Sequence, residues 1–125
     1  MAYQPRVMVV DDDENILSAF EDFLRKENCQ IVAETNAEEA LACFEEQRID
    51  LLITDIRLGL HSGITLLLQV RAAYPDVPTI VITGYPDVIT EKEAKTYGAD
   101  YYFLKPLELD KLRCALRKCL GVSIK

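Results

Sequence analysis

Five short apolar runs along the chain have the length and composition of buried β-strands. Two of them, Val7–Val10 and Leu51–Thr54, are almost free of polar residues, as expected of central strands that are covered on both faces. The five predicted strands are Val7–Val10, Gln30–Glu34, Leu51–Thr54, Thr79–Ile82 and Tyr101–Leu104.

Between these strands, apolar residues recur at the spacing of amphipathic helices. The first helix carries Ile16, Phe20, Phe23 and Leu24 at positions i, i+4, i+7 and i+8. Asn36, followed three residues later by Glu39, predicts the capped start of a second helix. The other helices are predicted through Ile64, Leu67 and Leu68 to Tyr74–Pro75, from about Asp87 to Tyr97 with Gly98 as cap, and after Pro106 through Leu109, Leu112, Leu116 and Leu120.

Strands that alternate with helices through short connections predict an α/β fold with a parallel sheet. The right-handed crossover rule permits a five-stranded sheet of order 2-1-3-4-5, with helices on both faces. At 125 residues the chain has the size of one domain, so we expect a single domain over residues 1–125. Residues 121–125 are expected to form a tail or the start of a linker.

Composition excludes several classes of function. The net charge of −7 argues against a nucleic-acid-binding surface on this domain. No run of 18 apolar residues is present and the N-terminus lacks the apolar stretch of a signal peptide, so we expect no membrane span and a cytoplasmic location. The four cysteines form no C-x-x-C pair and are expected to be small, reduced core residues rather than zinc ligands.

Polar side chains with related chemistry follow four of the predicted strands. Asp11 and Asp12 follow the first, Asp55 the third, Thr83 the fourth and Lys105 the fifth. The carboxyl ends of parallel strands meet at one edge of a sheet, where ligands of open α/β sheets bind. We therefore expect these five side chains to converge.

Convergence would give this group a specific chemistry. Three adjacent carboxylates repel one another, and a divalent cation such as Mg²⁺ relieves that repulsion. An aspartate carboxylate is a competent nucleophile in phosphoryl transfer, and Lys105 and Thr83 can donate to phosphoryl oxygens. Taken singly, Thr83 is typical of a strand and Lys105 of a surface, while Asp13 is expected to be only a helix cap. The interpretation as a metal and phosphoryl site therefore rests on the occurrence of all five residues together, each after a predicted strand.

With these motifs the chain resembles the receiver domain of two-component response regulators from about Arg6 to Leu120. The resemblance rests on the segments Val9–Glu14, Leu52–Asp55, Val81–Gly84 and Tyr102–Pro106. It implies a domain that takes up phosphate from a partner and is not an enzyme acting on a separate substrate.

The resemblance also assigns roles to residues. Asp55 would be phosphorylated by a sensor histidine kinase or a phosphotransfer protein. Mg²⁺, or Mn²⁺, would be bound by Asp11, Asp12 and Asp55 together with the backbone carbonyl of Arg57, with Asp12 a direct ligand. Thr83 and Lys105 would contact the phosphoryl group, and the Lys105–Pro106 bond is expected to be cis.

Tyr102 stands at the aromatic switch position of this family. Its ring would turn inward when Thr83 moves toward the phosphoryl group, biasing the face formed by the fourth helix, the Tyr101–Leu104 strand and the last helix. Basic residues on the last helix, with Asp100 nearby, suit either a phosphorylation-dependent homodimer or a solvated helix face; they are Lys111, Arg113, Arg117 and Lys118. A C-terminal output domain in the full-length protein is a further expectation.

Two other functions stay open at this point. The first is a pseudo-receiver, which is a protein–protein interaction module of the same fold that never takes up phosphate. The second is a phosphatase of the haloacid-dehalogenase type, in which Asp11 and Asp13 would form the opening motif and Thr83 and Lys105 the later motifs. That family also needs a further acidic pair at a strand end after the lysine, whereas Glu108 and Asp110 are expected at the start of a helix. One departure from the receiver pattern is that Leu58 and Gly59 replace the usual methionine and proline.

Overall fold

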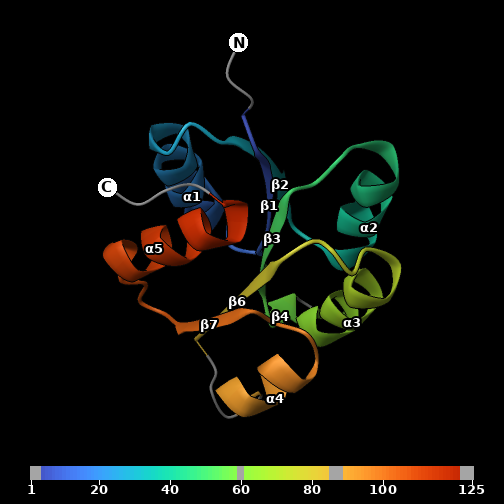
Figure 1. Cartoon of the computed structure of the whole chain (residues 1–125). Coiled ribbons are helices and arrows are strands. Elements are labelled where there is room, and N and C mark those ends of the chain that lie inside the picture. Colours follow the sequence, from blue (N-terminus) through green and yellow to red (C-terminus); the bar gives the residue numbers. More distant parts are fainter. Residues whose placement is uncertain (1–3, 59–60, 85–88, 122–125) are drawn as a thin grey trace.

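The chain forms a five-stranded parallel sheet flanked by helices (Figure 1). The computed structural model describes residues 4–58, 61–84 and 89–121, with the backbone alone for Leu58, His61 and Ser62. The strand order β2-β1-β3-β6-β7 is the predicted order 2-1-3-4-5 once the strands are counted in chain order. The strands are β1 (Arg6–Val10), β2 (Gln30–Glu34), β3 (Leu51–Asp55), β6 (Thr79–Thr83) and β7 (Tyr101–Leu104).

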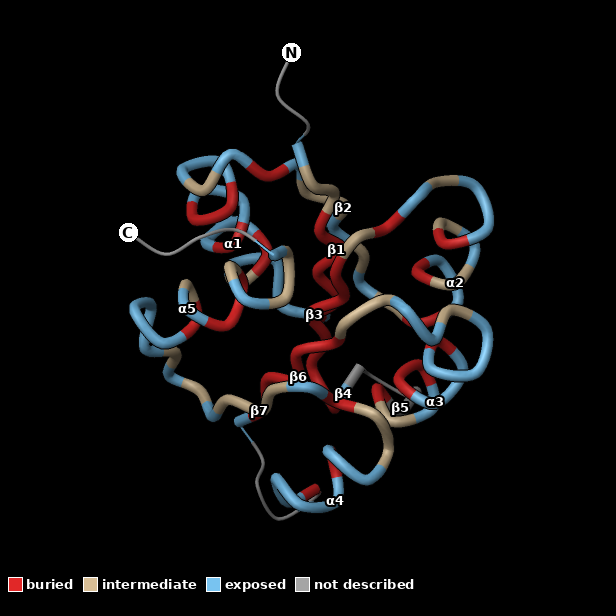
Figure 2. The backbone as a smooth tube through the Cα atoms, viewed as in Figure 1, coloured by how far each residue is buried: buried red, intermediate tan, exposed pale blue. Residues whose placement is uncertain are grey.

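Helices cover both faces of this sheet. Two of them, α1 (Glu14–Lys26) and α5 (Leu109–Leu120), lie on one face. The other face is covered by α2 (Ala37–Glu46), α3 (Gly63–Ala73) and α4 (Glu91–Thr96). Figure 2 shows that the central strands are buried along their length, while the outer surfaces of the helices are exposed. Burial on both faces explains the continuous apolar sequences of β1 and β3.

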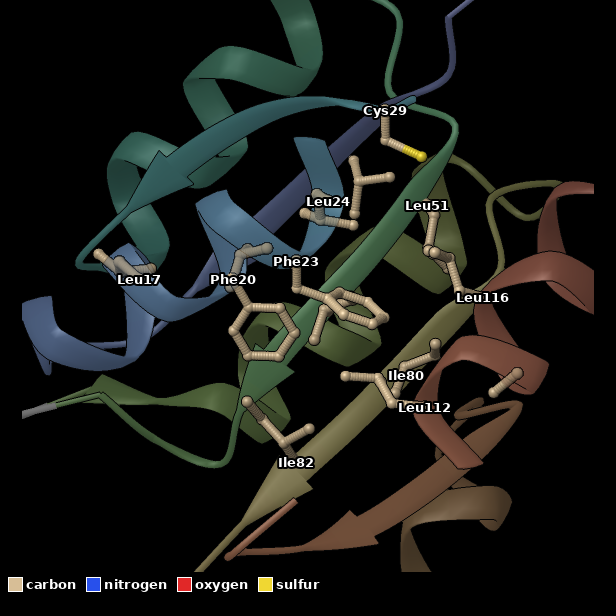
Figure 3. Packing of buried hydrophobic residues seen from close by; sticks show 14 residues of the cluster. Leu17, Phe20, Phe23, Leu24, Cys29, Leu51, Ile80, Ile82, Leu112 and Leu116 are labelled. Carbon is tan, nitrogen blue, oxygen red and sulfur yellow. The ribbon is translucent and has the colours of Figure 1, made fainter. Parts of the chain in front are cut away.

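The largest cluster of buried side chains lies between the sheet, α1 and α5 (Figure 3). Phe20 and Phe23 of α1 pack edge to face, with ring centroids 6.5 Å apart. They lie against the sheet beside Leu112 and Leu116 of α5. This packing fixes α1 and α5 on the sheet and thereby the two segments, before α1 and before α5, that carry Asp12 and Lys105.

A two-stranded hairpin, which the sequence analysis did not predict, follows β3. It pairs β4 (Arg57–Leu58) with β5 (His61–Ser62) in antiparallel fashion. The N–H of Gly63 donates to the carbonyl of Ile56 over 2.7 Å and closes the base of the hairpin. This bond joins the two ends of the segment between β3 and α3. Gly59 lies outside the described residues.

The buried face of α3 differs from the prediction. Leu67 is fully buried as expected, but Leu68 is 45% exposed, and Leu66 and Val70 are buried instead. The reason is that α3 packs in two directions, with Leu66 and Val70 toward α2 and Leu67 toward α4. Because α3 is buried over a wide face, its sequence has no single narrow stripe of apolar residues from which the buried positions could be predicted.

The start of α4 was also predicted wrongly. Ile89 and Thr90 are not helical, and α4 begins at Glu91; Asp87, where the sequence analysis placed the start, lies outside the described residues. Thr90 is the N-cap of a capping box, accepting from the Glu93 N–H while the Glu93 carboxylate accepts from the Thr90 N–H. Gly98 follows the helix with a φ of +114°, which confirms its predicted place at the C-terminal end.

The basic face of α5 is less available than the sequence suggested. Glu27, at the end of α1, accepts from Arg113 over 3.2 Å and from Arg117 over 2.9 Å. Two of the four predicted surface cations are thus paired with α1, whereas Lys111 and Lys118 are exposed and Lys111 pairs only with the nearby Glu108. Tertiary pairing with Glu27 cannot be inferred from the periodicity of α5 alone.

Asp100 likewise has an internal role. Its carboxylate accepts from the N–H of Thr79, and its own N–H donates to the Thr79 carbonyl, both over 2.8 Å. Asp50 makes the same pair of 2.8 Å bonds with Arg6 at the start of β1. These two aspartates satisfy backbone groups at the amino ends of strands, where the parallel ladder leaves them unpaired.

The cysteines are all free thiols, as predicted. Cys29 is buried and Cys43 and Cys119 are partly buried, but Cys114 is exposed on α5, so the expectation of four core cysteines is wrong for that residue. Among the described residues, no helix is long and apolar enough to cross a membrane.

The contrast between adjacent leucines of α3 gives a direct test of the packing. Leu67→Ala should reduce the free energy of unfolding by about 2–5 kcal/mol, because it leaves a cavity in the core. Leu68→Ala, the matched control, should change it by no more than about 0.5 kcal/mol. Urea unfolding of both variants measures the difference. Equal losses would contradict the orientation of α3.

Candidate functional site

Three carboxylates meet at the carboxyl edge of the sheet. Asp11 and Asp12 follow β1, Asp55 ends β3, and β1 and β3 are direct neighbours in register. One carboxylate oxygen from each of the three lies within 4.8 Å of the others. Asp11 is fully buried and Asp55 almost so, whereas Asp12 is exposed. The predicted convergence of these acids is therefore present, with its open side at Asp12.

Lys105 follows β7, an edge strand of the sheet, and its side chain reaches this cluster past the end of β6. Its ammonium lies 2.7 Å from Asp55 Oδ2 and 2.9 Å from Asp11 Oδ2, donating to both. The long stem of the lysine passes over Gly84, where an added Cβ would lie 3.9 Å from Lys105 Cδ. The Lys105–Pro106 bond is cis, as expected from the resemblance. The site thus contains one ammonium shared by two buried carboxylates.

The pKa values of Asp11 and Lys105 are both shifted, because three carboxylates share one ammonium in a largely buried site. Burial raises the pKa of Asp11 and the Asp55 charge adds to the rise, although the Asp13 N–H and Lys105 act in the opposite direction. Burial would lower the pKa of Lys105, but the hydrogen bonds and charges of Asp55 and Asp11 outweigh it, so this pKa is raised overall. The ammonium is therefore held firmly in its charged form, and it does not neutralise all three acids.

The carboxylate of Asp55 is fixed through both of its oxygens. Oδ2 accepts from Lys105, and Oδ1 accepts from the N–H of Arg57 over 3.2 Å. The main-chain carbonyl of Asp55 also has a partner, because the buried hydroxyl of Thr54 donates to it over 2.9 Å. Asp55 is therefore constrained at three acceptor atoms.

Sequence reasoning missed two residues that contact Asp55. Thr54 was counted only as part of a strand, and Gly63 was not considered for the site. A polar residue in an otherwise aliphatic buried strand was the available signal for Thr54. For Gly63 it was a glycine directly before an apolar helix.

Thr83 ends β6, the strand next to β3, and is fully buried. Its carbonyl accepts from the Lys105 N–H over 2.8 Å, which ties the end of β6 to the segment that bears the ammonium. Thr83 therefore lies one strand from Asp55 and is directly connected to Lys105.

Tyr102 lies outside the acidic cluster. Its half-buried ring packs beside Ile89 and Ala94, and its hydroxyl donates to the Ile89 carbonyl over 2.7 Å. Burial raises the pKa of this phenol, and the charges of Glu91 and Glu93 add to the rise. Tyr102 thus connects β7 to the segment that enters α4.

The remaining acids considered from the sequence have structural roles at helix ends. Asp13 is the N-cap of α1, accepting from the Asn15 N–H over 2.9 Å, as predicted. Glu108 precedes α5 and pairs with Lys111, while Asp110 pairs with Arg113. Glu108 and Asp110 do not follow a strand and are not part of the acidic cluster, so the second acidic pair of a dehalogenase-type phosphatase is not formed by these residues.

The donor set suits a hard divalent cation. The three acids offer only oxygen ligands, and Asp12 leaves one side open to water, which is the kind of environment that Mg²⁺ prefers. Among the described residues, this is the one group of three or more acidic, histidine or cysteine side chains close enough to bind a metal ion.

Comparison with known proteins gives the same family from sequence and from structure. The sequence profile of the response regulator receiver domain matches residues 7–117. Transcriptional regulatory protein ZraR of Escherichia coli is 33% identical over 115 residues, which are 92% of this chain and 26% of ZraR. The chain spans about a quarter of the length of the curated relatives it matches.

Solved structures agree with the fold over nearly the whole chain. A CheY-like receiver domain protein from Methanospirillum hungatei JF-1 matches with a TM-score of 0.87 and 28% identity, covering 95% of each chain. The beryllofluoride-activated NtrC4 receiver domain dimer matches with a TM-score of 0.86 and 26% identity, covering 93% of this chain and 96% of that one. On the strength of the match over residues 7–117, this chain belongs to the response regulator receiver domain family.

Proposed function

We propose that the domain takes up a phosphoryl group on Asp55 in a Mg²⁺-dependent reaction. The observation that carries this proposal is the ammonium of Lys105, placed 2.7 Å from Asp55 Oδ2 inside a cluster of three carboxylates. Phosphoryl transfer requires mainly positioning and neutralisation of charge. Lys105 supplies part of the neutralising charge, and a bound Mg²⁺ would supply the rest. Membership of the receiver family gives the proposal independent support.

The residues present fit a bound Mg²⁺. Asp12 and Asp55 would hold the ion with Asp11 in support, and the backbone carbonyl of Arg57 would complete the protein ligands. Bound there, the cation supplies positive charge for phosphoryl oxygens. Mn²⁺ prefers the same oxygen ligands and would occupy the same position.

The reaction itself is an exchange of phosphorus bonds. A carboxylate oxygen of Asp55 attacks the phosphorus of a phosphohistidine on a sensor kinase or a phosphotransfer protein. The new P–O bond forms as the P–N bond breaks, and the released imidazole nitrogen takes up a proton from solvent. Lys105 donates to one oxygen of the transferred group and Thr83 to another. The domain catalyses only its own phosphorylation and dephosphorylation.

The signal would leave the site through Thr83 and Tyr102. Thr83 moves toward the phosphoryl group, and the Tyr102 ring takes the space that it leaves. Such a movement breaks or shifts the bond from the Tyr102 hydroxyl to the Ile89 carbonyl, which measures 2.7 Å in the structure described here. The face formed by α4, β7 and α5 then exists in two states.

The similarity to longer response regulators supports a proposal about the full-length protein to which this domain belongs. Curated relatives are about four times as long as this chain, which supports a C-terminal output domain in the full-length protein. Residues 1–125 would form one receiver domain, with 121–125 as tail or linker; residues 122–125 lie outside the described part. The domain would work in the cytoplasm, without binding nucleic acid itself, and would dimerise through the α4–β7–α5 face once phosphorylated.

Phosphorylation of Asp55 is testable by intact-mass measurement. Incubation with acetyl phosphate and Mg²⁺ should add one phosphoryl group to the wild type and none to Asp55→Asn, because the amide is not a nucleophile. Asp13→Asn, which changes an exposed cap, should behave as the wild type.

Other outcomes of this experiment would favour the alternatives. An unmodified wild type would support the pseudo-receiver. Turnover of a generic phosphomonoester that is lost in Asp11→Asn but kept in Asp55→Asn would support the phosphatase.

Metal binding should appear as stabilisation. A ligand that binds only the folded state raises its stability by about 2.7 kcal/mol at about 100 times its dissociation constant. Mg²⁺ should therefore raise the thermal midpoint of the wild type, and Asp12→Asn should remove most of this rise. Asp22→Asn, a matched change of an exposed acid on α1, should retain it. Equal rises in all three proteins would contradict the site.

The proposed dimer can be tested by analytical ultracentrifugation. Beryllofluoride, a phosphoryl mimic, should convert the wild type from monomer to dimer in the presence of Mg²⁺. Tyr102→Ala should weaken this conversion while leaving the uptake of phosphate on Asp55 intact, because Tyr102 lies outside the acidic cluster. A wild type that stays monomeric with beryllofluoride would overturn the dimer.

A further inference from the structure

The main-chain carbonyl of Asp55 accepts a hydrogen bond from a side chain. The side-chain hydroxyl of the preceding residue, Thr54, donates to it over 2.9 Å, and Thr54 is fully buried. In register, Thr54 lies between Val10 of β1 and Val81 of β6, both fully buried. A valine would fill such a position without the cost of burying a hydroxyl. We therefore look for the role of the hydroxyl in the hydrogen bond that it donates to the Asp55 carbonyl.

Gly63 makes a second close contact with the same carbonyl. Gly63, the first residue of α3, approaches it so closely that any Cβ there would overlap the Asp55 oxygen and lie 2.9 Å from the Ile56 Cα. The Gly63 N–H donates to the next carbonyl, that of Ile56, over 2.7 Å. The start of α3 and the Thr54 hydroxyl thus bracket the peptide group between Asp55 and Ile56.

The orientation of this peptide group determines how the carboxylate of Asp55 is presented. It sets the direction in which the chain leaves β3, and hence the position of the Arg57 N–H that donates to Asp55 Oδ1 over 3.2 Å. With Oδ1 held there, Oδ2 faces Lys105 at 2.7 Å. A rotation of the peptide group would move the Arg57 N–H and the Arg57 carbonyl together.

We propose that Thr54 is a positioning residue for phosphoryl transfer, acting through the main-chain carbonyl of Asp55. This inference rests on the proposed function of Asp55 as phosphoacceptor. The Thr54 hydroxyl holds the peptide group after Asp55 in the orientation that aims one carboxylate oxygen at Lys105 and directs the Arg57 carbonyl toward the metal ligands. Thr54 touches neither the phosphoryl group nor the cation.

The test compares Thr54→Val, which keeps the shape and removes the hydroxyl, with Thr54→Ser, which keeps the hydroxyl. Misplacement of reacting groups by about 1 Å costs up to about 100-fold in rate, so partial release of the carbonyl should slow phosphorylation by about 5- to 10-fold. Initial rates are measured by intact mass with acetyl phosphate and Mg²⁺. The Mg²⁺ dissociation constant of the unphosphorylated protein, from calorimetric titration, should rise severalfold in Thr54→Val, and Thr54→Ser should restore both values.

A matched variant separates positioning from general stability. Thr79→Val changes another buried threonine at the far end of β6, and it should leave the phosphorylation rate and the Mg²⁺ dissociation constant unchanged. Should Thr54→Val not fold, Thr54→Cys replaces it, because cysteine and serine differ in one atom and the thiol is a weak donor. Slow phosphorylation in Cys but not in Ser would then support the proposal.

The experiment distinguishes a failure of the proposed phosphorylation of Asp55 from a failure of the proposed role of Thr54. A wild type that takes up no phosphoryl group would remove the function of Asp55. A wild type that is phosphorylated, with Thr54→Val or Thr54→Cys matching its rate and its Mg²⁺ dissociation constant, would overturn the role of Thr54 alone. An equal loss of rate in Thr79→Val would also overturn it.

Discussion

Repulsion among Asp11, Asp12 and Asp55 is the constraint on which the rest of the structure depends. Parallel pairing of β1 with β3 brings the three carboxylates within 4.8 Å, and two of them are buried. Lys105 reaches across the sheet to offset part of this charge, with its stem packed over Gly84. This imbalance of charge is one that a bound divalent cation would relieve. The packing of this edge and the reaction proposed for it therefore have one electrostatic origin.

Much of this arrangement was predictable from the sequence, because strands buried on both faces leave continuous apolar runs. Those runs located all five strands to within one residue at each end, and the acids that follow them located the cluster. The handedness of crossovers permits the strand order that is observed, and the positions of the acids after the first and third strands favoured placing these two side by side. Asp13 and Asn36 were predictable as caps because their preference is local.

What the sequence did not reveal depends on contacts between distant segments. The face of α3 was misassigned at Leu68 because the helix packs toward both α2 and α4. Arg113 and Arg117 were taken for surface charges, since nothing near them in sequence points to Glu27. The hydroxyl of Thr54 and the close approach of Gly63 are likewise visible only when β3 and α3 are placed together. Periodicity reports which side of an element is apolar, but not which partner satisfies its polar atoms.

The hairpin between β3 and α3 begins and ends at almost the same point, because Gly63 bonds back to Ile56. The bond between Gly63 and Ile56 can therefore keep the end of β3 beside the start of α3 when the sequence between these two residues changes. Such a segment can diverge among relatives while the scaffold beneath it stays the same. Since Arg57 belongs to it, the surroundings of the proposed phosphoacceptor, Asp55, can be varied in evolution without rebuilding the domain.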